Sequence, residues 1–258
     1  MSTKPAPVAV ALDAQDLDTA LRWAEQTGPY VSTIKVGLEL YLKHGAQAVQ
    51  RTREASGGRD LFLDLKLHDI PNTVAGAARG VAALRPTYLT VHASGGAAMI
   101  RAAVEALPQT RIAAVTVLTS LSEADLSAVG LIGPPLDAAR RLAALAVAAG
   151  ARAIVCSPRE VAAVRAEVGP DVTLITPGVR PPGAAHGDQT RVATPEQALA
   201  DGADLLVIGR PITGAADPAA AAREIGAALA RWAAPGPPKV DDPCGDGGES
   251  ARLLEECE

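Results

Sequence analysis

The sequence is poor in aromatic residues and in cysteine. Aromatic residues make up 2% of the chain, so the core must be built largely from the aliphatic members of its 48% hydrophobic residues. That share is ample for a large single core. The three cysteines, Cys156, Cys244 and Cys257, are odd in number and form no CxxC pair, which argues against a disulfide framework or a zinc site. A reducing cytoplasm is the simplest location to expect.

A membrane segment, a secretory leader and a surplus of basic residues are also missing. No run approaches the roughly 18 apolar residues of a membrane span, and Met1–Pro7 lacks the apolar segment of a signal peptide. The net charge is -5, whereas general nucleic-acid binders usually carry a basic patch. We therefore expect no membrane or nucleic-acid partner, while a local phosphate site is compatible with this charge.

Lysine is scarce, since only five of the 24 basic residues are lysines. Two of the five, Lys35 and Lys66, fall at the ends of apolar, strand-like runs. A lysine ammonium can give up a proton, whereas arginine stays charged. The use of lysine rather than arginine at these two positions suggests that an amine takes part in the chemistry of the site.

Apolar runs alternate with amphipathic, alanine-rich segments along the chain. The expected strands are Val8–Leu12, Ser32–Val36, Leu61–Lys66, Tyr88–His92, Ile112–Leu118, Ala153–Cys156, Val172–Ile175 and Leu205–Ile208. The expected helices are Asp16–Thr27, Glu39–Glu54, Asn72–Leu84, Ala97–Leu107, Pro135–Ala149, Pro158–Val168, Pro195–Ala200 and Pro218–Trp232, with a short extra helix over Ser122–Val129. Thr194 and Asp217 are the expected N-caps of the last two main helices.

Eight strand–helix pairs predict an α/β fold of the (β/α)8 TIM-barrel type, with an open doubly wound sheet as the alternative. We expect residues 1–233 to form one catalytic barrel domain. After Trp232 the composition shifts to Pro, Gly, Asp and Glu. This shift predicts a disordered acidic tail over residues 234–258.

Polar residues or glycines stand at nearly every predicted strand end, where a barrel places its active site. They are Asp13, Lys35, Asp64, Lys66, Asp69, His92, Thr119, Ser120, Arg180, Gly209 and Arg210. Each also has a plainer interpretation. Asp13 is a candidate helix cap, Lys35 and Asp64 a candidate structural ion pair, and His92 a candidate wall residue. The Thr119-Ser120 pair is a candidate cap for the short helix that follows.

The third predicted strand carries the most informative pattern. Alternation places Phe62, Asp64 and Lys66 on one face, and Asp69 follows just past the strand end. With Lys35 these charges would form an alternating array in which an Asp repels a substrate carboxylate and a Lys protonates the carbon left behind. A Schiff base at Lys66 is the competing chemistry, which the flanking carboxylates disfavour.

The loops after the seventh and eighth strands predict a phosphate site. They carry glycines and polar residues at Gly178, Arg180, Gly183, Gly187, Gln189, Gly209 and Arg210. Glycine lets backbone N–H groups approach an anion, and arginine offers phosphate two parallel donors. The Pro- and Gly-rich segment 181–188 suggests a mobile lid over that phosphate.

Several motifs together resemble the orotidine 5'-phosphate decarboxylase family of bacterial type. The central one is Asp64-Leu-Lys66-Leu-His-Asp69-Ile70-Pro-Asn-Thr73. Others are Ala-Leu-Asp13, Ile-Lys35-Val-Gly, Val-His-Ala-Ser-Gly-Gly, Thr-Pro-Gly-Val-Arg180-Pro, Gly-Asp-Gln189 and Val-Ile-Gly209-Arg210-Pro. The resemblance runs from Val8 to about residue 230.

The resemblance implies decarboxylation of orotidine 5'-monophosphate to uridine 5'-monophosphate in de novo pyrimidine synthesis, without metal or cofactor. It implies catalytic roles for Lys66 as proton donor to C6, and for Asp64, Lys35 and Asp69. It assigns the ribose to Asp13 and Lys35, and the pyrimidine to Thr119 or the neighbouring Ser120. It assigns the phosphate to Arg180, Gln189, Gly209 and Arg210. It also implies a homodimer in which Asp69, Ile70 and Thr73 reach the partner's site.

Two other hypotheses stay open at this point. One is a metal-dependent phosphosugar decarboxylase or aldolase-type lyase, because such relatives share the Asp-x-Lys-x-x-Asp core. The other is a barrel that binds a phosphorylated ligand without turnover.

Overall fold

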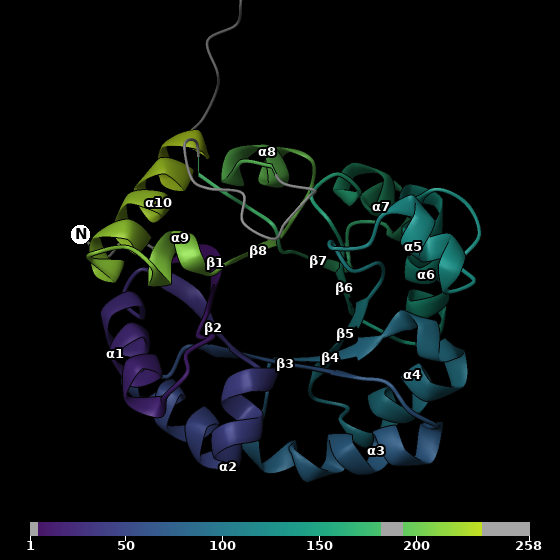
Figure 1. Ribbon diagram of the computed structural model, residues 1–258, viewed down its shortest axis with the longest axis horizontal. Helices are drawn as coiled ribbons and strands as arrows, with labels where there is room; N and C mark the ends of the chain where they lie inside the picture. The colour runs from purple at the N-terminus through teal and green to yellow at the C-terminus, as the bar shows by residue number, and fades with distance from the viewer. Residues whose placement is uncertain (1–4, 182–192, 234–258) are drawn as a thin grey trace, which may run out of the picture.

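The computed structural model describes residues 5–181 and 193–233. In this part of the chain eight parallel strands close into a barrel in sequence order, and β1 pairs with β8. Figure 1 looks down the barrel and shows the strands as an inner ring with the helices outside it. This closure confirms the predicted (β/α)8 barrel, because an open doubly wound sheet would leave two strand edges unpaired.

The element bounds follow the predicted alternation. The strands are β1 (Ala6–Ala11), β2 (Val31–Gly37), β3 (Asp60–Leu67), β4 (Tyr88–His92), β5 (Arg111–Val115), β6 (Ala153–Val155), β7 (Thr173–Thr176) and β8 (Leu205–Ile208). The helices are α1 (Leu17–Thr27), α2 (Leu38–Ala55), α3 (Pro71–Gly80), α4 (Gly96–Ala106), α5 (Glu123–Ala128), α6 (Pro135–Ala148), α7 (Val161–Val168), α8 (Pro195–Ala200), α9 (Arg210–Thr213) and α10 (Pro218–Trp232). Short 3-10 turns, Ala82–Leu84 and Ala93–Gly95, flank β4.

The predicted caps are confirmed where the chain enters α8 and α10. Thr194 accepts a hydrogen bond from the N–H of Gln197 at 3.2 Å, and Asp217 accepts one from Ala220 at 3.0 Å. The suggestion that Asp13 caps the first helix is wrong. Asp16 does so instead, accepting from the N–H of Thr19 at 2.8 Å.

Some boundaries differ from the prediction for local reasons. β5 ends at Val115 because its neighbour β6 ends at Val155, whose carbonyl takes the last N–H, that of Thr116. α7 begins at Val161 rather than at Pro158, since the carboxylate of Glu160 accepts from the N–H of Ser157 at 3.1 Å and closes a turn. Two further differences are α3, which stops at Gly80, and the short helix α9, which was not predicted.

Small side chains and two aromatic rings pack inside the barrel. Phe62, the only phenylalanine of the chain, meets Tyr88 edge to face, with ring centroids 5.9 Å apart. A second, larger apolar cluster lies between strands and helices. The interior is therefore a packed core, which leaves the barrel mouth as the place for a ligand.

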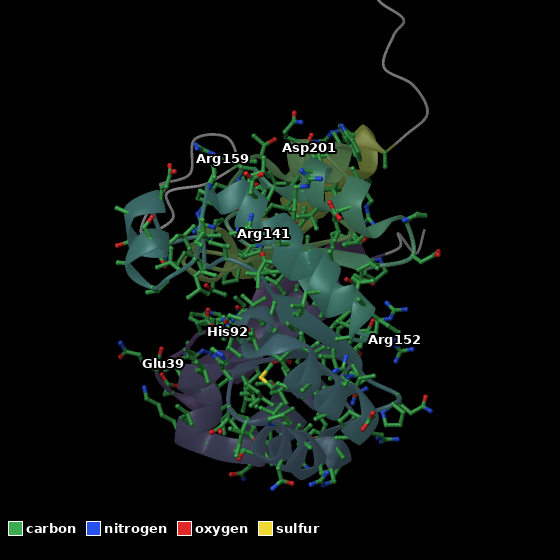
Figure 2. The ribbon with its side chains drawn as sticks, turned by 90° about the vertical axis from the view of Figure 1, so that its right-hand side faces the viewer. Glu39, His92, Arg141, Arg152, Arg159 and Asp201 are labelled. Carbon is green, nitrogen blue, oxygen red and sulfur yellow. The ribbon has the colours of Figure 1, made fainter. Side chains whose placement is uncertain are left out.

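Figure 2 shows the two ends of the barrel from the side. Glu39 and His92, which lie just after or at the end of their strands, are toward one end, and Arg152, just before β6, is toward the other. The carboxyl ends of the strands thus gather at the end marked by His92. Within the described ranges, no helix is long and apolar enough to cross a membrane.

Candidate active site

A cavity of about 420 Å³ opens at the carboxyl ends of the strands, a size typical of small-molecule sites. Its lining includes nine of the predicted site residues: Asp13, Lys35, Asp64, Lys66, Thr119, Gly178, Arg180, Gly209 and Arg210. Phe62 and Cys156 line it as well, and burial raises the pKa of the Cys156 thiol far above its usual range. The thiol is therefore an inert, neutral part of the wall.

Four charged side chains form a continuous row along one side of this cavity. The ammonium of Lys35 lies 3.0 Å from Oδ1 of Asp13 and 3.3 Å from Oδ2 of Asp64. The ammonium of Lys66 lies 2.8 Å from Oδ1 of Asp64 and 2.9 Å from its Oδ2. The charges alternate in sign from β1 through β2 to β3, so each inner group touches two opposite charges.

Burial makes this row electrostatically strong at its centre. Burial alone would favour the neutral carboxyl of Asp64, but the charges of Lys35 and Lys66, with hydrogen bonds, outweigh it and hold its pKa below the usual range. Burial alone would likewise lower the pKa of Lys35, but the carboxylates of Asp64 and Asp13 raise it overall. The central ion pair is therefore charged on both sides at neutral pH.

The backbone is bent where β3 presents Lys66. Lys66 has a φ of 47°, in the left-handed region that costs a non-glycine residue roughly 1–3 kcal/mol. The pairing of β3 with β4 also shifts register between Leu63 and Leu67. Despite this irregularity the side chains of Asp64 and Lys66 meet, as the alternation predicted.

Gly37 has no side chain, and this leaves room for the side chains of Asp13 and Lys35 in the charged row. A Cβ at this position would lie 2.9 Å from Oδ1 of Asp13 and 3.0 Å from Nζ of Lys35. A side chain at this position would therefore require Asp13 or Lys35 to shift from its place in the row. Sequence reasoning missed Gly37 as a site residue, although it directly follows the Ile-Lys35-Val pattern.

Thr90 on β4 is a second residue that sequence reasoning missed. Its hydroxyl lies 3.1 Å from Oδ1 of Asp64 and 2.7 Å from the backbone nitrogen of Lys66. The sequence did contain a clue to this role. Alternation along the predicted strand places Thr90 on the same face as Tyr88 and His92.

His92 is a half-buried residue at the rim. Burial, followed by the nearby His68 and Lys66, lowers the pKa of its imidazole, which is therefore neutral at pH 7. The two imidazole rings are 5.4 Å apart. This position fits the interpretation of His92 as a wall residue.

The loops after β7 and β8 contribute the opposite part of the lining. Gly178 has a φ of 80°, which turns the chain into the Arg180 segment, and Gly209 leads directly into Arg210 at the start of α9. Both arginines line the cavity. Gln189 and most of the predicted lid, residues 181–188, lie outside the described residues.

The remaining predicted residues lie away from the cavity or at its edge. Asp69, Ile70 and Thr73 are exposed, and the carboxylate of Asp69 accepts a hydrogen bond from the N–H of Ile70 at 2.6 Å. The single chain therefore assembles Lys35, Asp64 and Lys66 of the predicted array, with Asp13 in place of Asp69. On the base side, Thr119 lines the cavity, whereas Ser120 is exposed.

Comparison with known protein families identifies the family of this chain. The family described as orotidine 5'-phosphate decarboxylase / HUMPS matches residues 6–225, which is nearly the whole described barrel. The chain belongs to this family. The charged row and both arginines lie inside the matched segment.

Relatives of this decarboxylase family match over most of their length. An orotidine 5'-phosphate decarboxylase of Thermobifida fusca is 71% identical over 231 residues, which covers 89% of this chain and 98% of the relative. One of Frankia casuarinae is 60% identical, covering 87% of this chain and 88% of the relative. The crystal structure of the Lactobacillus acidophilus enzyme matches with a TM-score of 0.74 and 37% identity, covering 85% of this chain and 97% of that one.

The contribution of Asp64 to stability is predicted to depend on pH. Its folded pKa lies below the unfolded value of about 3.9, so its contribution is present above that value and is lost as the pH falls through the folded pKa. We expect the stability difference between wild type and Asp64→Asn to shrink as the pH drops from about 6 to about 3. Urea unfolding across this range measures it, and a constant difference would contradict the assignment.

Proposed function

We propose that the chain converts orotidine 5'-monophosphate to uridine 5'-monophosphate and CO2, a step of pyrimidine biosynthesis. The observation that carries this proposal is the buried Asp64 carboxylate between two lysine ammoniums, in the same cavity as Arg180 and Arg210. The family of the chain and the printed names of its relatives support the same reaction.

The phosphate end would supply binding energy away from the reacting carbon. Arg180 and Arg210, the backbone at Gly209, and Gln189 would hold the phosphate, since arginine binds it with two parallel donors. Asp13 and Lys35 would contact the ribose, and Thr119 the pyrimidine. Binding energy from such remote contacts can offset unfavourable contacts at the reacting centre.

The row of charges would carry the chemistry. Asp64 is fixed and charged, so it would repel the substrate carboxylate placed beside it. The bond from C6 to the carboxylate breaks, CO2 leaves, and the electron pair stays on C6. The ammonium of Lys66 then gives its proton to C6, which yields uridine 5'-monophosphate.

We propose that this reaction uses neither metal nor cofactor. The second candidate remains a metal-dependent phosphosugar decarboxylase or aldolase-type lyase. The distinguishing feature is that Lys35 and Lys66 occupy both sides of the Asp64 carboxylate, whose oxygens a divalent ion would need.

A direct assay separates these candidates. Orotidine 5'-monophosphate is followed by absorbance in the presence of excess chelator, and the rate should equal that without chelator. Loss of turnover on chelation, with recovery after addition of a divalent metal, would favour the metal-dependent reaction.

Lys66→Ala tests the assigned proton donor. Turnover should fall by at least about 1,000-fold because both the proton donor and one of the two lysine partners of Asp64 are lost, while affinity for uridine 5'-monophosphate should change less than about 10-fold. Steady-state kinetics and calorimetric titration measure the two effects. A near-normal rate in this variant would refute the role.

We further propose a homodimer with shared sites. The segment that follows Lys66 exposes Asp69, Thr73 and the apolar side chain of Ile70, which is 66% exposed. In such a dimer the partner subunit would bury Ile70, and Asp69 of each chain would approach the charged row of the other chain. The enzyme is proposed to be cytoplasmic, with the nucleotide as its ligand and no membrane or nucleic-acid partner.

Mixing two inactive variants tests the shared site. Lys66→Ala and Asp69→Ala subunits should each be nearly inactive, but a mixed dimer holds one site with both residues intact. Random exchange of equal amounts should restore activity in about one quarter of the sites. No recovery, despite mixed dimers in native mass spectrometry, would show that each chain completes its own site.

A further inference from the structure

The regular pairing of β3 with β4 is interrupted near Lys66, one of the four residues of the charged row. Leu63 pairs with Leu89 and Leu67 pairs with Val91, so four residue steps on β3 span only two on β4. Lys66 lies in this interval with its left-handed φ of 47°. A regular strand would give its N–H a backbone partner, and a bulge removes that partner.

The side chain of Thr90 provides the hydrogen-bond acceptor for the backbone N–H of Lys66. Its Oγ1 is 2.7 Å from the backbone nitrogen of Lys66 and 3.1 Å from Oδ1 of Asp64, and Thr90 is fully buried. An N–H can only donate, and an ionised carboxylate can only accept. The hydroxyl must therefore accept from Lys66 and donate its single hydrogen to Asp64.

These contacts close a ring of hydrogen bonds. The backbone of Lys66 is held by Thr90, Thr90 is held to Asp64, and Asp64 is held to the Lys66 ammonium at 2.8 Å. Both ends of the lysine are thereby fixed to the same carboxylate. Thr90 is the only member of the ring that bears no formal charge.

We infer that Thr90 is a positioning residue of the reaction, whose hydroxyl fixes the bulged backbone of Lys66 and orients the Asp64 carboxylate that faces the substrate. This inference rests on the proposed decarboxylase function. It assigns the hydroxyl, rather than the volume of the side chain, as the group that matters. Small displacements of reacting groups are costly, at about 100-fold in rate for 1 Å.

Three variants test the hydroxyl. Thr90→Val keeps the shape and removes the hydroxyl, whereas Thr90→Ser keeps the hydroxyl. Thr110→Val is the matched control, because Thr110 is a buried threonine before β5, at the other end of the barrel, and its hydroxyl donates to the carbonyl of Pro86 at 2.9 Å. Each is assayed for kcat, KM and affinity for uridine 5'-monophosphate, which lacks the carboxylate.

We expect Thr90→Val to lower kcat between about 10-fold and 100-fold, with KM and product affinity changed less than about 3-fold. Thr90→Ser should keep kcat within about 3-fold of wild type, as should Thr110→Val. Amide hydrogen exchange at Lys66 should become faster in Thr90→Val and stay slow in Thr90→Ser.

The inference is overturned if folded Thr90→Val keeps the wild-type kcat, or if KM and product affinity weaken as much as kcat falls. Should Thr90→Val not fold, Thr90→Ala and Thr90→Ser make the same comparison, since both lack the methyl group and only serine keeps the hydroxyl. Equal kcat in those two would also overturn it. Failure of wild type to act on orotidine 5'-monophosphate would instead refute the proposed function.

Discussion

The Asp64 carboxylate, buried between two ammonium groups, is the constraint on which the site depends. A charge in such a position is tolerated only when it is fully paired, and removal of one partner leaves the other charge costly. Lys35, Lys66 and Thr90 all place a donor on this carboxylate. Each therefore has a fixed position, although they come from three different strands.

The closed barrel makes this convergence possible. Its strands run parallel, so their carboxyl ends meet at one mouth, and the packed interior around Phe62 and Tyr88 blocks the space below. The charged row comes from β1 to β3, and the arginine loops follow β7 and β8. Because β8 pairs with β1, these segments are neighbours around the ring although they are far apart in sequence.

Much of this arrangement could be predicted from the sequence, because it depends on periodicity. The alternation of apolar and polar residues placed Asp64 and Phe62 on one face of β3, which the structure shows to be the inner face, and the polar strand ends located the mouth. What could not be predicted depends on local geometry. The bulge at Lys66 and the role of Gly37 arise from distances between strands, which no pattern within one strand encodes. Asp69 is exposed in the single chain, and its predicted place in the array rests on the proposed homodimer.

The four members of the charged row carry formal charges that cancel, which limits how far their influence extends. An array of alternating charges has a field that fades within a few ångströms, so it acts strongly on a group in contact and hardly at all on a ligand in solution. The whole chain has a net charge of -5 and would repel an anionic nucleotide at long range. If Arg180 and Arg210 hold the phosphate as proposed, their attraction acts at short range, and added salt would screen it together with the overall repulsion while leaving the contacts inside the cavity largely unchanged.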